Sequence, residues 1–469
     1  MSEISHAPEK HSASEFAPLD PDTGFSLSPE FVAEVVQAIA REDRTTARAL
    51  VYPLPAPDQA ELFDQITPDE RHVLTEILSD AFDSETLAEM SPEAAEDVLE
   101  ALGAEKSAEV LAEMETDDAV HILEDLAPEA QQEILDEMPA DVRDEVVESL
   151  TYPLESAGRL MRNTLVAVPE SWSVGDTIDY LRATEELPDH FYVLYAVDGQ
   201  FHPTGRILLG NILSHKREVK LNTIMNGSTF AVHTHTDQEE VAYLFRKYAL
   251  VEAPVVNDAG ALVGTITVDD VVDVIQEEEE EDYLRAGGVS TPDFGSRIFD
   301  AVKARFGWLF LNLWTAALAA FVISQFEDSI EKIVALAVLM PVVASMGGNT
   351  GTQAVTVAVR AIATKHLTDA NRWSYVRKEM LIGFLNGCAL GVLMALGSYL
   401  WFRELPFAGV MLAAATITMT TAGLFGALIP ILLDKRGIDP AIASSIFLTT
   451  VTDCLGFFSF LGLATLILL

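Results

Sequence analysis

The chain has 469 residues, of which 73 are acidic and 29 are basic, so its formal net charge is −44 at neutral pH. Residues 302–469 hold 9 acidic and 11 basic residues, and subtracting these from the totals leaves 64 and 18 in residues 1–301, a net charge of −46. This charge excludes nucleic acid and anionic lipid as partners of that part, and it predicts a self-repulsion that cations would relieve. Alternatively, the acidity only keeps the domain soluble. The two cysteines, Cys388 and Cys454, indicate neither a disulfide framework nor a CxxC metal site.

Residues 1–28 are polar and contain proline, so we expect them to be disordered. No basic stretch followed by an apolar core is present at this end, which argues against a cleavable signal peptide. We therefore expect the acidic part of the chain to remain in the cytosol.

Residues 29–152 are predicted to form an acidic helical solenoid. An apolar residue recurs every 12 positions, and Thr67-Pro68-Asp69-Glu70 is one of several places where proline and acids follow it. Proline in the first turn is typical of a helix start, and a fixed period is typical of stacked repeats. The period leaves room for one helix of about two turns and a corner in each repeat. The repeating positions are Ile66, Leu78, Met90, Leu102, Met114, Leu126, Met138 and Leu150.

An internal duplication follows, with one copy in residues 153–216 and the other in residues 217–276. Leu160–Val168 of the first copy matches Ile224–Val232 of the second. Each copy alternates short apolar strands with an amphipathic helix, which predicts two small α/β domains.

This order of elements resembles a pair of CBS domains, regulatory modules that often bind adenosine nucleotides between the two copies. The resemblance implies that Thr267 and Asp270 of the second copy hold a ribose, so that ATP or another adenosine nucleotide is a candidate ligand. Leu208 and Asn211 stand at the corresponding positions of the first copy, where we expect a damaged site.

Residues 277–304 are predicted to form an acidic connecting helix. It contains six adjacent acids, Glu277 to Asp282, a pattern typical of a solvated helix face or a linker. It is also the only covalent connection between the acidic part and the hydrophobic part of the chain.

Residues 305–469 are predicted to form a membrane domain of five helices, because five hydrophobic segments have about the 20 residues that a span needs. Basic residues concentrate after the second and the fourth segment, which places those loops and the N-terminus in the cytoplasm and Leu469 outside. The segments are 308–325, 333–358, 380–402, 408–433 and 441–469.

The second segment contains Gly347-Gly348-Asn349-Thr350-Gly351. Glycines at this density are expected to loosen or break a membrane helix, and the freed carbonyls and polar side chains would suit a hydrated cation. The alternative is close helix packing through Gly347 and Gly351, which have the small-xxx-small spacing.

The last segment opens with Asp439-Pro440, and Asp453 lies further along the same helix. A charge well inside a bilayer costs roughly 2.5–3.5 kcal/mol and normally faces a bundle interior or a water-filled path. We therefore predict that Asp439 is an ion ligand. The alternative is that Asp439 is an ordinary helix cap just outside the membrane.

Taken together, these parts resemble the MgtE family of magnesium channels or transporters. The residues that carry the resemblance are Ser156–Met161, Thr236–Val241, Gly347–Gly351 and Asp439-Pro440-Ala441. The resemblance implies a homodimer in the inner membrane, with its pore on the two-fold axis. It also implies an acidic plug helix that magnesium, bound between the cytosolic domains, holds closed.

The resemblance further implies roles for individual residues. Asp439 would be the pore ligand, and Ala443 would line the pore together with the glycine-rich stretch. His121 and Ile446 depart from the family pattern at a sensor position and a pore position. The implied sensor ligands are Asp117, Asp270, Asp273, Glu278, Glu281 and Asp282.

Two other interpretations remain open from the sequence. The chain could be a membrane-anchored sensor of metal or nucleotide that transports nothing, or a transporter of manganese or cobalt. An enzyme is disfavoured, because the sequence has no P-loop and no constellation of nucleophile and base.

Overall fold

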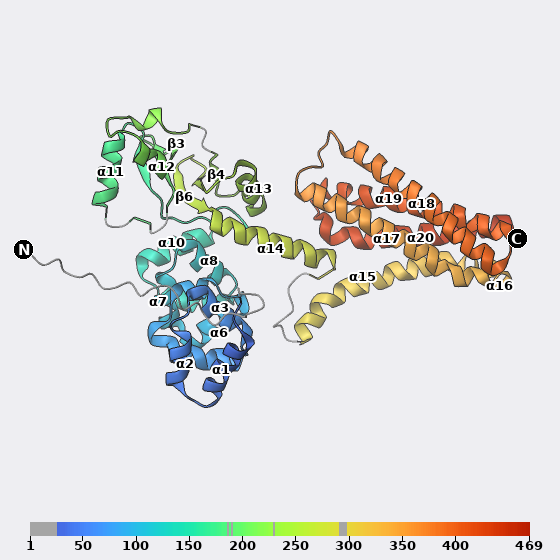
Figure 1. The fold of residues 1–469 in the computed structure, drawn as a ribbon, viewed down its shortest axis with the longest axis horizontal. Helices are drawn as coiled ribbons and strands as arrows, with labels where there is room; N and C mark the ends of the chain where they lie inside the picture. The colour runs from blue at the N-terminus through green and yellow to red at the C-terminus, as the bar shows by residue number, and fades with distance from the viewer. Residues whose placement is uncertain (1–25, 185–186, 189–190, 228–229, 290–297) are drawn as a thin grey trace, which may run out of the picture. The chain divides into compact units, whose positions relative to one another are not determined.

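The computed structural model describes residues 26–184, 187–188, 191–227, 230–289 and 298–469. The chain divides into two compact units, Met1–Ile275 and Gln276–Leu469 (Figure 1). The segment that we expected to be disordered therefore lies almost wholly outside the described residues.

The first unit begins with a stack of short helices, as predicted. From Ala56 onward, most helices begin 12 or 24 residues apart, and the periodic apolar residues lie at or next to helix ends. Ile66, Leu78, Met90 and Met138 are buried in one continuous core, which explains the period: each repeat contributes one such residue to the same core. The helices are α1 (Pro29–Ala40), α2 (Arg44–Val51), α3 (Ala56–Gln65), α4 (Pro68–Leu78), η1 (Ser79–Ala81), α5 (Ser84–Ala88), α6 (Pro92–Leu102), α7 (Ala104–Ala112), α8 (Thr116–Glu124), α9 (Pro128–Glu137) and α10 (Ala140–Leu150).

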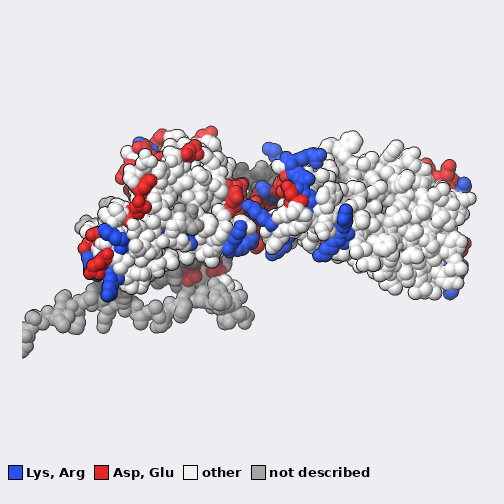
Figure 2. Space-filling model, turned by 90° about the horizontal axis from the view of Figure 1, so that it is seen from above, with Lys and Arg blue, Asp and Glu red and all other residues white. Residues whose placement is uncertain are grey.

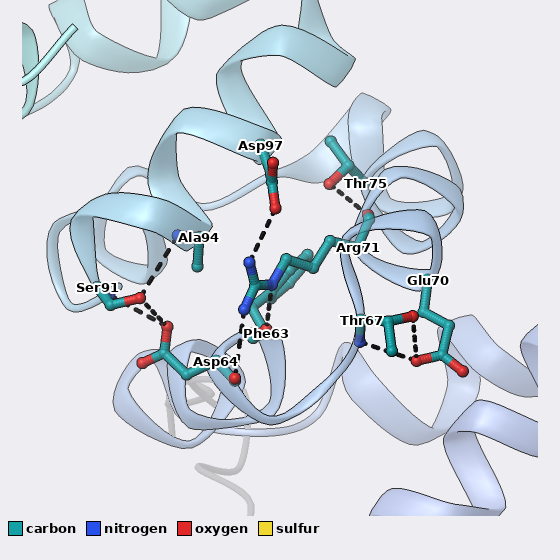
Figure 3. Close-up of polar contacts among 9 residues, drawn as sticks. All are labelled: Phe63, Asp64, Thr67, Glu70, Arg71, Thr75, Ser91, Ala94 and Asp97. Atoms are coloured by element: carbon teal, nitrogen blue, oxygen red, sulfur yellow. Dashed lines mark hydrogen bonds and ion pairs between the residues drawn. The ribbon is translucent and has the colours of Figure 1, made fainter. Parts of the chain in front are cut away.

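Arg71, on α4, connects its own helix with α3 and α6 of this stack (Figure 3). Its guanidinium donates to the carbonyls of Phe63 and Asp64 at the end of α3, at 2.7 and 3.3 Å, and to the carboxylate of Asp97 on α6 at 2.8 Å. The carboxylate of Asp64 in turn accepts from the hydroxyl of Ser91 at 2.6 Å. These bonds satisfy helix-end carbonyls that would otherwise lack partners inside the stack.

The duplication is confirmed by two three-stranded sheets with the same topology. In each sheet the middle strand pairs in parallel with the first strand and antiparallel with the last, and both copies have a register shift at the same place. The elements of the first copy are β1 (Ala167–Pro169), α11 (Val174–Ala183), β2 (Val193–Val197), β3 (Pro203–Leu208) and α12 (Leu209–Ser214). Those of the second are η2 (Leu221–Thr223), β4 (Val232–His233), α13 (Gln238–Tyr248), β5 (Glu252–Val256), β6 (Leu262–Thr267) and the start of α14 (Val268–Ala286).

The two copies exchange their first segments. The backbone of Arg162, from the start of the first copy, pairs with Thr265 in β6, and that of Asn226 pairs with Arg206 in β3. A Cβ at Gly264 would lie 2.8 Å from the carbonyl oxygen of Arg162, so this close approach requires glycine. Arg162 is thereby fixed next to the strand that leads into α14.

The acidic run belongs to α14, which continues without a break from the second copy to Ala286. Its N-terminal part is in the first unit and its acidic C-terminal part is in the second. The predicted connecting helix therefore begins inside a longer helix, and residues 290–297 of the prediction lie outside the described residues.

In the described part of the second unit, four helices are long and apolar enough to cross a membrane: Ala301–Ser324, Arg372–Phe402, Leu405–Asp434 and Ser444–Leu468. On the face shown in Figure 2, the surface of this unit is largely free of charge between two charged ends. The helices are α15 (Ile298–Ser324), α16 (Glu327–Lys332), α17 (Ala335–Ala363), α18 (Arg372–Phe402), α19 (Leu405–Asp434) and α20 (Pro440–Leu468).

The prediction of five spans is thus confirmed for four helices. The fifth candidate, α17, has 29 residues and the length of a span. This helix is not one of the four apolar helices, because the polar stretch between Ser345 and Gln353 lowers its mean hydropathy. It packs on α19 and α20, so it is part of the same bundle.

The expectation of a broken backbone in this segment is wrong, because α17 is helical throughout Gly347–Gly351. The packing alternative explains the glycines instead. A Cβ at Gly347 would lie 2.6 Å from the Thr418 side chain, and one at Gly351 would lie 2.8 Å from Leu448. Both glycines are buried, so α17 is held close to α19 and α20.

Glycines also set the approach of α18 to α19, and this can be tested. A Cβ at Gly383 would lie 2.3 Å from the carbonyl oxygen of Met419, whereas a Cβ at Gly397 on the same helix meets nothing within 4 Å. We expect Gly383→Ala to lower the stability of the second unit, because an overpacking cost of about 1–3 kcal/mol exceeds the gain of about 1 kcal/mol in helix propensity. Thermal unfolding of the purified protein in detergent measures this.

The matched control is Gly397→Ala, which makes the same substitution without the clash. We expect it to leave the unfolding temperature unchanged or slightly raised. Equal unfolding temperatures for the two variants would show that α18 and α19 are not closely packed at Gly383.

Candidate functional site

Asp439 caps the last membrane helix. Its Oδ1 accepts from the backbone N–H of Ala441 at 2.7 Å, and its Oδ2 accepts from Arg285 at 3.2 Å. It immediately precedes α20, so its hydrogen bond to Ala441 is that of an N-terminal helix cap. The carboxylate is also neutralised by an arginine of its own chain.

Asp453 lies near the middle of the same helix, thirteen residues after its start and fifteen before its end. Its side chain is half-buried, and among the described residues no ion-pair partner faces it. Thr449 lies one turn before it, and its hydroxyl donates to the Ser445 carbonyl at 2.8 Å. Sequence analysis assigned the ion-ligand role to Asp439 and named Asp453 only as lying further along the same helix; the position of Asp453 near the middle of this helix is the signal that could have singled it out.

The predicted pore-lining residues of α17 separate into two faces. Gly347 and Gly351 are buried inside the single chain, whereas Gly348 is half-buried with open space around it, and Asn349 is exposed. The Thr350 hydroxyl donates to the Met346 carbonyl at 2.8 Å. The side chain of Ala443 lies outside the described residues. The exposed polar side chains of α17 are Ser345, Asn349, Thr352, Gln353 and Thr356.

The acidic end of α14 brings three predicted ligands of the second unit together. Glu281 forms an ion pair with Arg285, which also binds Asp439. Burial and the negative charge of Asp439 raise the pKa of Asp282. Carboxylates thus outnumber the single guanidinium at this position.

A larger cluster surrounds Arg162 in the first unit, and we call it the Arg162 cluster. Its guanidinium contacts Glu115 at 2.5 Å and Asp117 at 3.0 Å at the start of α8. It also contacts Asp269 at 3.1 Å and Asp270 at 2.5 Å at the start of α14. The predicted ligands Asp117 and Asp270 are therefore brought together, but around an arginine.

Negative charge exceeds positive charge in the Arg162 cluster, because one guanidinium pairs with four carboxylates, of which those of Asp117 and Asp270 are largely buried. Burial and the charge of Asp270 raise the pKa of Asp117 well above its usual range, and burial also raises the pKa of Asp270. Burial raises the pKa of Asp118 to about 6. The buried Oδ1 of Asp117 accepts no hydrogen bond among the described residues. The cluster retains capacity for further positive charge.

The predicted ribose pair is present but engaged. Asp270 Oδ2 accepts from the backbone N–H of Thr267 at 3.1 Å and from its hydroxyl at 2.5 Å, while Oδ1 accepts from Arg162. A nucleotide hydroxyl at Asp270 would have to compete with these donors.

The remaining predicted ligand of the first unit, Asp273, lies near Glu89 and His121. Burial and nearby carboxylates raise its pKa, and burial and Asp273 raise that of Glu89. Within the ranges that the structure describes, no group of three or more His, Cys, Asp or Glu side chains is arranged to hold a metal ion.

The pKa of Asp118 predicts a pH dependence. Since its pKa is higher in the folded than in the unfolded chain, its ionisation destabilises the fold as pH rises from about 4 to 6 and above. We expect Asp118→Asn to stabilise α8 by about 1–2 kcal/mol at pH 7.5 without divalent cations, after allowing for the lost interaction with the helix N-terminus. Amide hydrogen exchange of α8, corrected for the intrinsic rate, measures this.

Near pH 4, where Asp118 is mostly protonated in the folded chain, the difference between variant and wild type should disappear. Asp125→Asn at the exposed end of α8 is the matched control and should change neither value. A stabilisation that is the same at both pH values would refute the ionisation of Asp118 as its cause.

Family models and a solved structure show which known proteins the chain is similar to. The MgtE family model, described as a divalent cation transporter, matches residues 340–463; the MgtE intracellular N domain matches residues 54–155, and a CBS domain matches residues 221–277. A solved structure, the cytosolic domain of the Mg²⁺ channel MgtE in complex with ATP, is 30% identical with a TM-score of 0.47, covering 52% of this chain and 99% of that one.

Two curated relatives cover most of the chain. The magnesium transporter MgtE of Thermus thermophilus is 36% identical over 330 residues, which are 69% of this chain and 72% of the relative. The magnesium transporter MgtE of Bacillus subtilis is 32% identical over 317 residues, which are 67% of this chain and 70% of the relative. These similarities, together with the apolar helices, show that the chain is a membrane protein that belongs to the MgtE family.

Proposed function

We propose that this protein transports divalent cations across the membrane, with magnesium as its main cargo. The observation that carries the proposal is the carboxylate of Asp453, which lies within a membrane span without a cationic partner among the described residues. An ionisable residue at such a depth marks an ion pathway by default. The curated relatives are named magnesium transporters, which supports the choice of cargo.

The chemistry of magnesium fits a pathway with few carboxylates. Mg²⁺ releases its water reluctantly, so an isolated carboxylate binds it mostly through the hydration shell, weakly enough to permit exit. Asp439 and Asp453 are 14 residues apart in sequence, about 21 Å along a helix. We assign Asp439 to the cytosolic mouth of the pathway and Asp453 to its interior.

A second copy of the chain completes the pathway in this proposal. Exposed polar side chains on α17, such as Asn349 and Thr352, would be costly against lipid. A homodimer would cover this face and place one Asp453 from each subunit beside a shared path. The basic residues after α17 and α19, including Lys365 and Lys435, support a cytoplasmic N-terminus and an external C-terminus in the inner membrane.

Cytosolic magnesium regulates the pathway in this proposal. The predicted sensor ligands are acidic residues that repel one another when magnesium is scarce, and magnesium relieves the repulsion. Relief would stabilise the position of α14 that closes the mouth at Asp439. The CBS pair would bind an adenosine nucleotide through Thr267 and Asp270 only in a state in which Arg162 releases Asp270. Of the predicted sensor ligands, Asp117 and Asp270 are bound by Arg162, so we assign the response to magnesium to the other four: Asp273, Glu278, Glu281 and Asp282.

Transport tests the pathway directly. We expect Asp453→Asn to reduce magnesium uptake into proteoliposomes by at least roughly tenfold, since the cation would lose its charged partner within the span. Asp439→Asn should reduce uptake less, because Asp439 lies at the edge of the membrane. Manganese and cobalt uptake, measured in parallel, rank the cargo.

The matched control is Asp434→Asn, which removes an exposed carboxylate from the last position of α19, just before the loop that leads to Asp439. It should transport like the wild type. No uptake of any divalent cation by the wild type would favour a membrane-anchored sensor instead.

Regulation has its own test. We expect neutralisation of Glu278, Glu281 and Asp282 to leave uptake high when magnesium inside the proteoliposomes is raised, since magnesium could no longer hold the acidic end of α14 in place. The control neutralises Glu277, Glu279 and Glu280, three exposed acids of the same helix, and makes the same change in charge. Equal inhibition by internal magnesium in both triple variants would reject the sensor assignment.

A further inference from the structure

The backbone of Arg162 is fixed by two hydrogen bonds to Thr265. Its N–H donates to the Thr265 carbonyl at 2.8 Å, and its carbonyl accepts from the Thr265 N–H at 3.0 Å. Thr265 lies in β6, three residues before α14 begins. The side chain therefore starts from a rigid position beside the N-terminus of α14.

The guanidinium joins two parts of the first unit that are far apart in sequence. Glu115 and Asp117 belong to the solenoid, whereas Asp269 and Asp270 belong to the second CBS copy. The side chain of Arg162 is 14% exposed, that of Asp117 7% and that of Asp270 10%. The contacts with Asp117 and Asp270 therefore lie away from solvent, where ion pairs are screened least.

The charge balance shows why this position needs a cation. With Asp118, five carboxylates gather at the N-termini of α8 and α14. Each helix N-terminus supplies about half a positive charge, so the two helices together offset about one carboxylate. Without Arg162, the remaining carboxylates would repel one another and push the solenoid away from the CBS pair.

A divalent cation bound by carboxylate oxygens could in principle neutralise the same cluster. In this chain, however, Arg162 already occupies Asp117 Oδ2 and Asp270 Oδ1. The free Oδ1 of Asp117 leaves room for an additional cation beside Arg162.

Building on the regulation described above, we propose that Arg162 is a resident cation that locks the solenoid to the CBS pair without magnesium. Magnesium-dependent movement is then left to the carboxylates of α14 beyond the Arg162 cluster. Asp270 is also closed to a nucleotide ribose for as long as Arg162 holds it.

Removal of Arg162 should convert a magnesium-independent contact into a magnesium-dependent one. The experiment uses the full chain in detergent, with Cys388 and Cys454 replaced by alanine and spin labels on cysteines at Glu129 in α9 and Gln200 in the first CBS copy, both exposed. Double electron–electron resonance then measures the distance between the labels, in EDTA and in millimolar magnesium.

We expect the parent chain to give one narrow distance distribution under both conditions. In Arg162→Gln, we expect the attached population to fall by roughly a hundredfold relative to the detached one in EDTA, because the largely buried carboxylates have lost the guanidinium that pairs with them. Magnesium should restore the narrow distribution, since it can replace the guanidinium. A variant that has merely misfolded would not be rescued by magnesium.

Two further variants complete the design. Arg143→Gln removes an exposed arginine of α10 and should behave like the parent. Arg162→Lys keeps the charge but not the forked donors, so it should show partial detachment in EDTA and recovery in magnesium. If Arg162→Gln does not fold, Arg162→Lys still tests the proposal.

Three results would overturn the proposal: detachment of the parent chain in EDTA, attachment of Arg162→Gln in EDTA, or detachment of this variant that magnesium does not reverse. None of these measurements involves transport. A failure of the lock is therefore distinguishable from a failure of the proposed transport function.

Discussion

Mutual repulsion of carboxylates is the constraint on which the architecture of this protein depends. The first 301 residues carry a net charge of −46, and their helices place acids in first turns, where helix N-termini offset only part of the charge. Close packing of such elements requires cations at defined positions. Arg71 and Arg162 are two of them, each binding groups from several elements at once.

The carboxylates of the chain differ in whether a cationic side chain neutralises their charge. Those around Arg162 have a covalently tethered cation, which cannot leave. Asp439 also has an arginine, Arg285, but this residue is 30% exposed and shared with Glu281. Asp453 has no cationic partner among the described residues. In the proposed function, this difference in counter-charge separates the carboxylates with a structural role from Asp453, which would bind a mobile ion.

A second constraint is the close approach of helices in the hydrophobic unit. Burial of apolar surface does not drive helices together in lipid, so their association depends on close packing and on polar contacts. Gly347 and Gly351 bring α17 against α19 and α20, and Gly383 brings α18 against α19. The polar face of α17 remains exposed in the single chain, which is why a second copy enters the proposed function.

The sequence by itself determined every feature that repeats or that depends on local chemistry. The 12-residue period, the duplicated α/β copies, the proline-marked helix starts, four of the five spans and the cap at Asp439 are all local, because periodicity and capping need only neighbouring residues. Membership of the MgtE family was also readable from short motifs in a fixed order.

Only the tertiary structure decided which charged groups meet. Arg162 is 45 residues from Asp117 and 108 from Asp270, and only the exchange of first segments between the two CBS copies brings them together. The tertiary structure also decided that the glycine stretch of α17 forms a continuous helix instead of a broken one. This outcome depends on packing against Thr418 and Leu448 of other helices. Long-range pairing of this kind leaves no period in the sequence, so no local pattern predicts it.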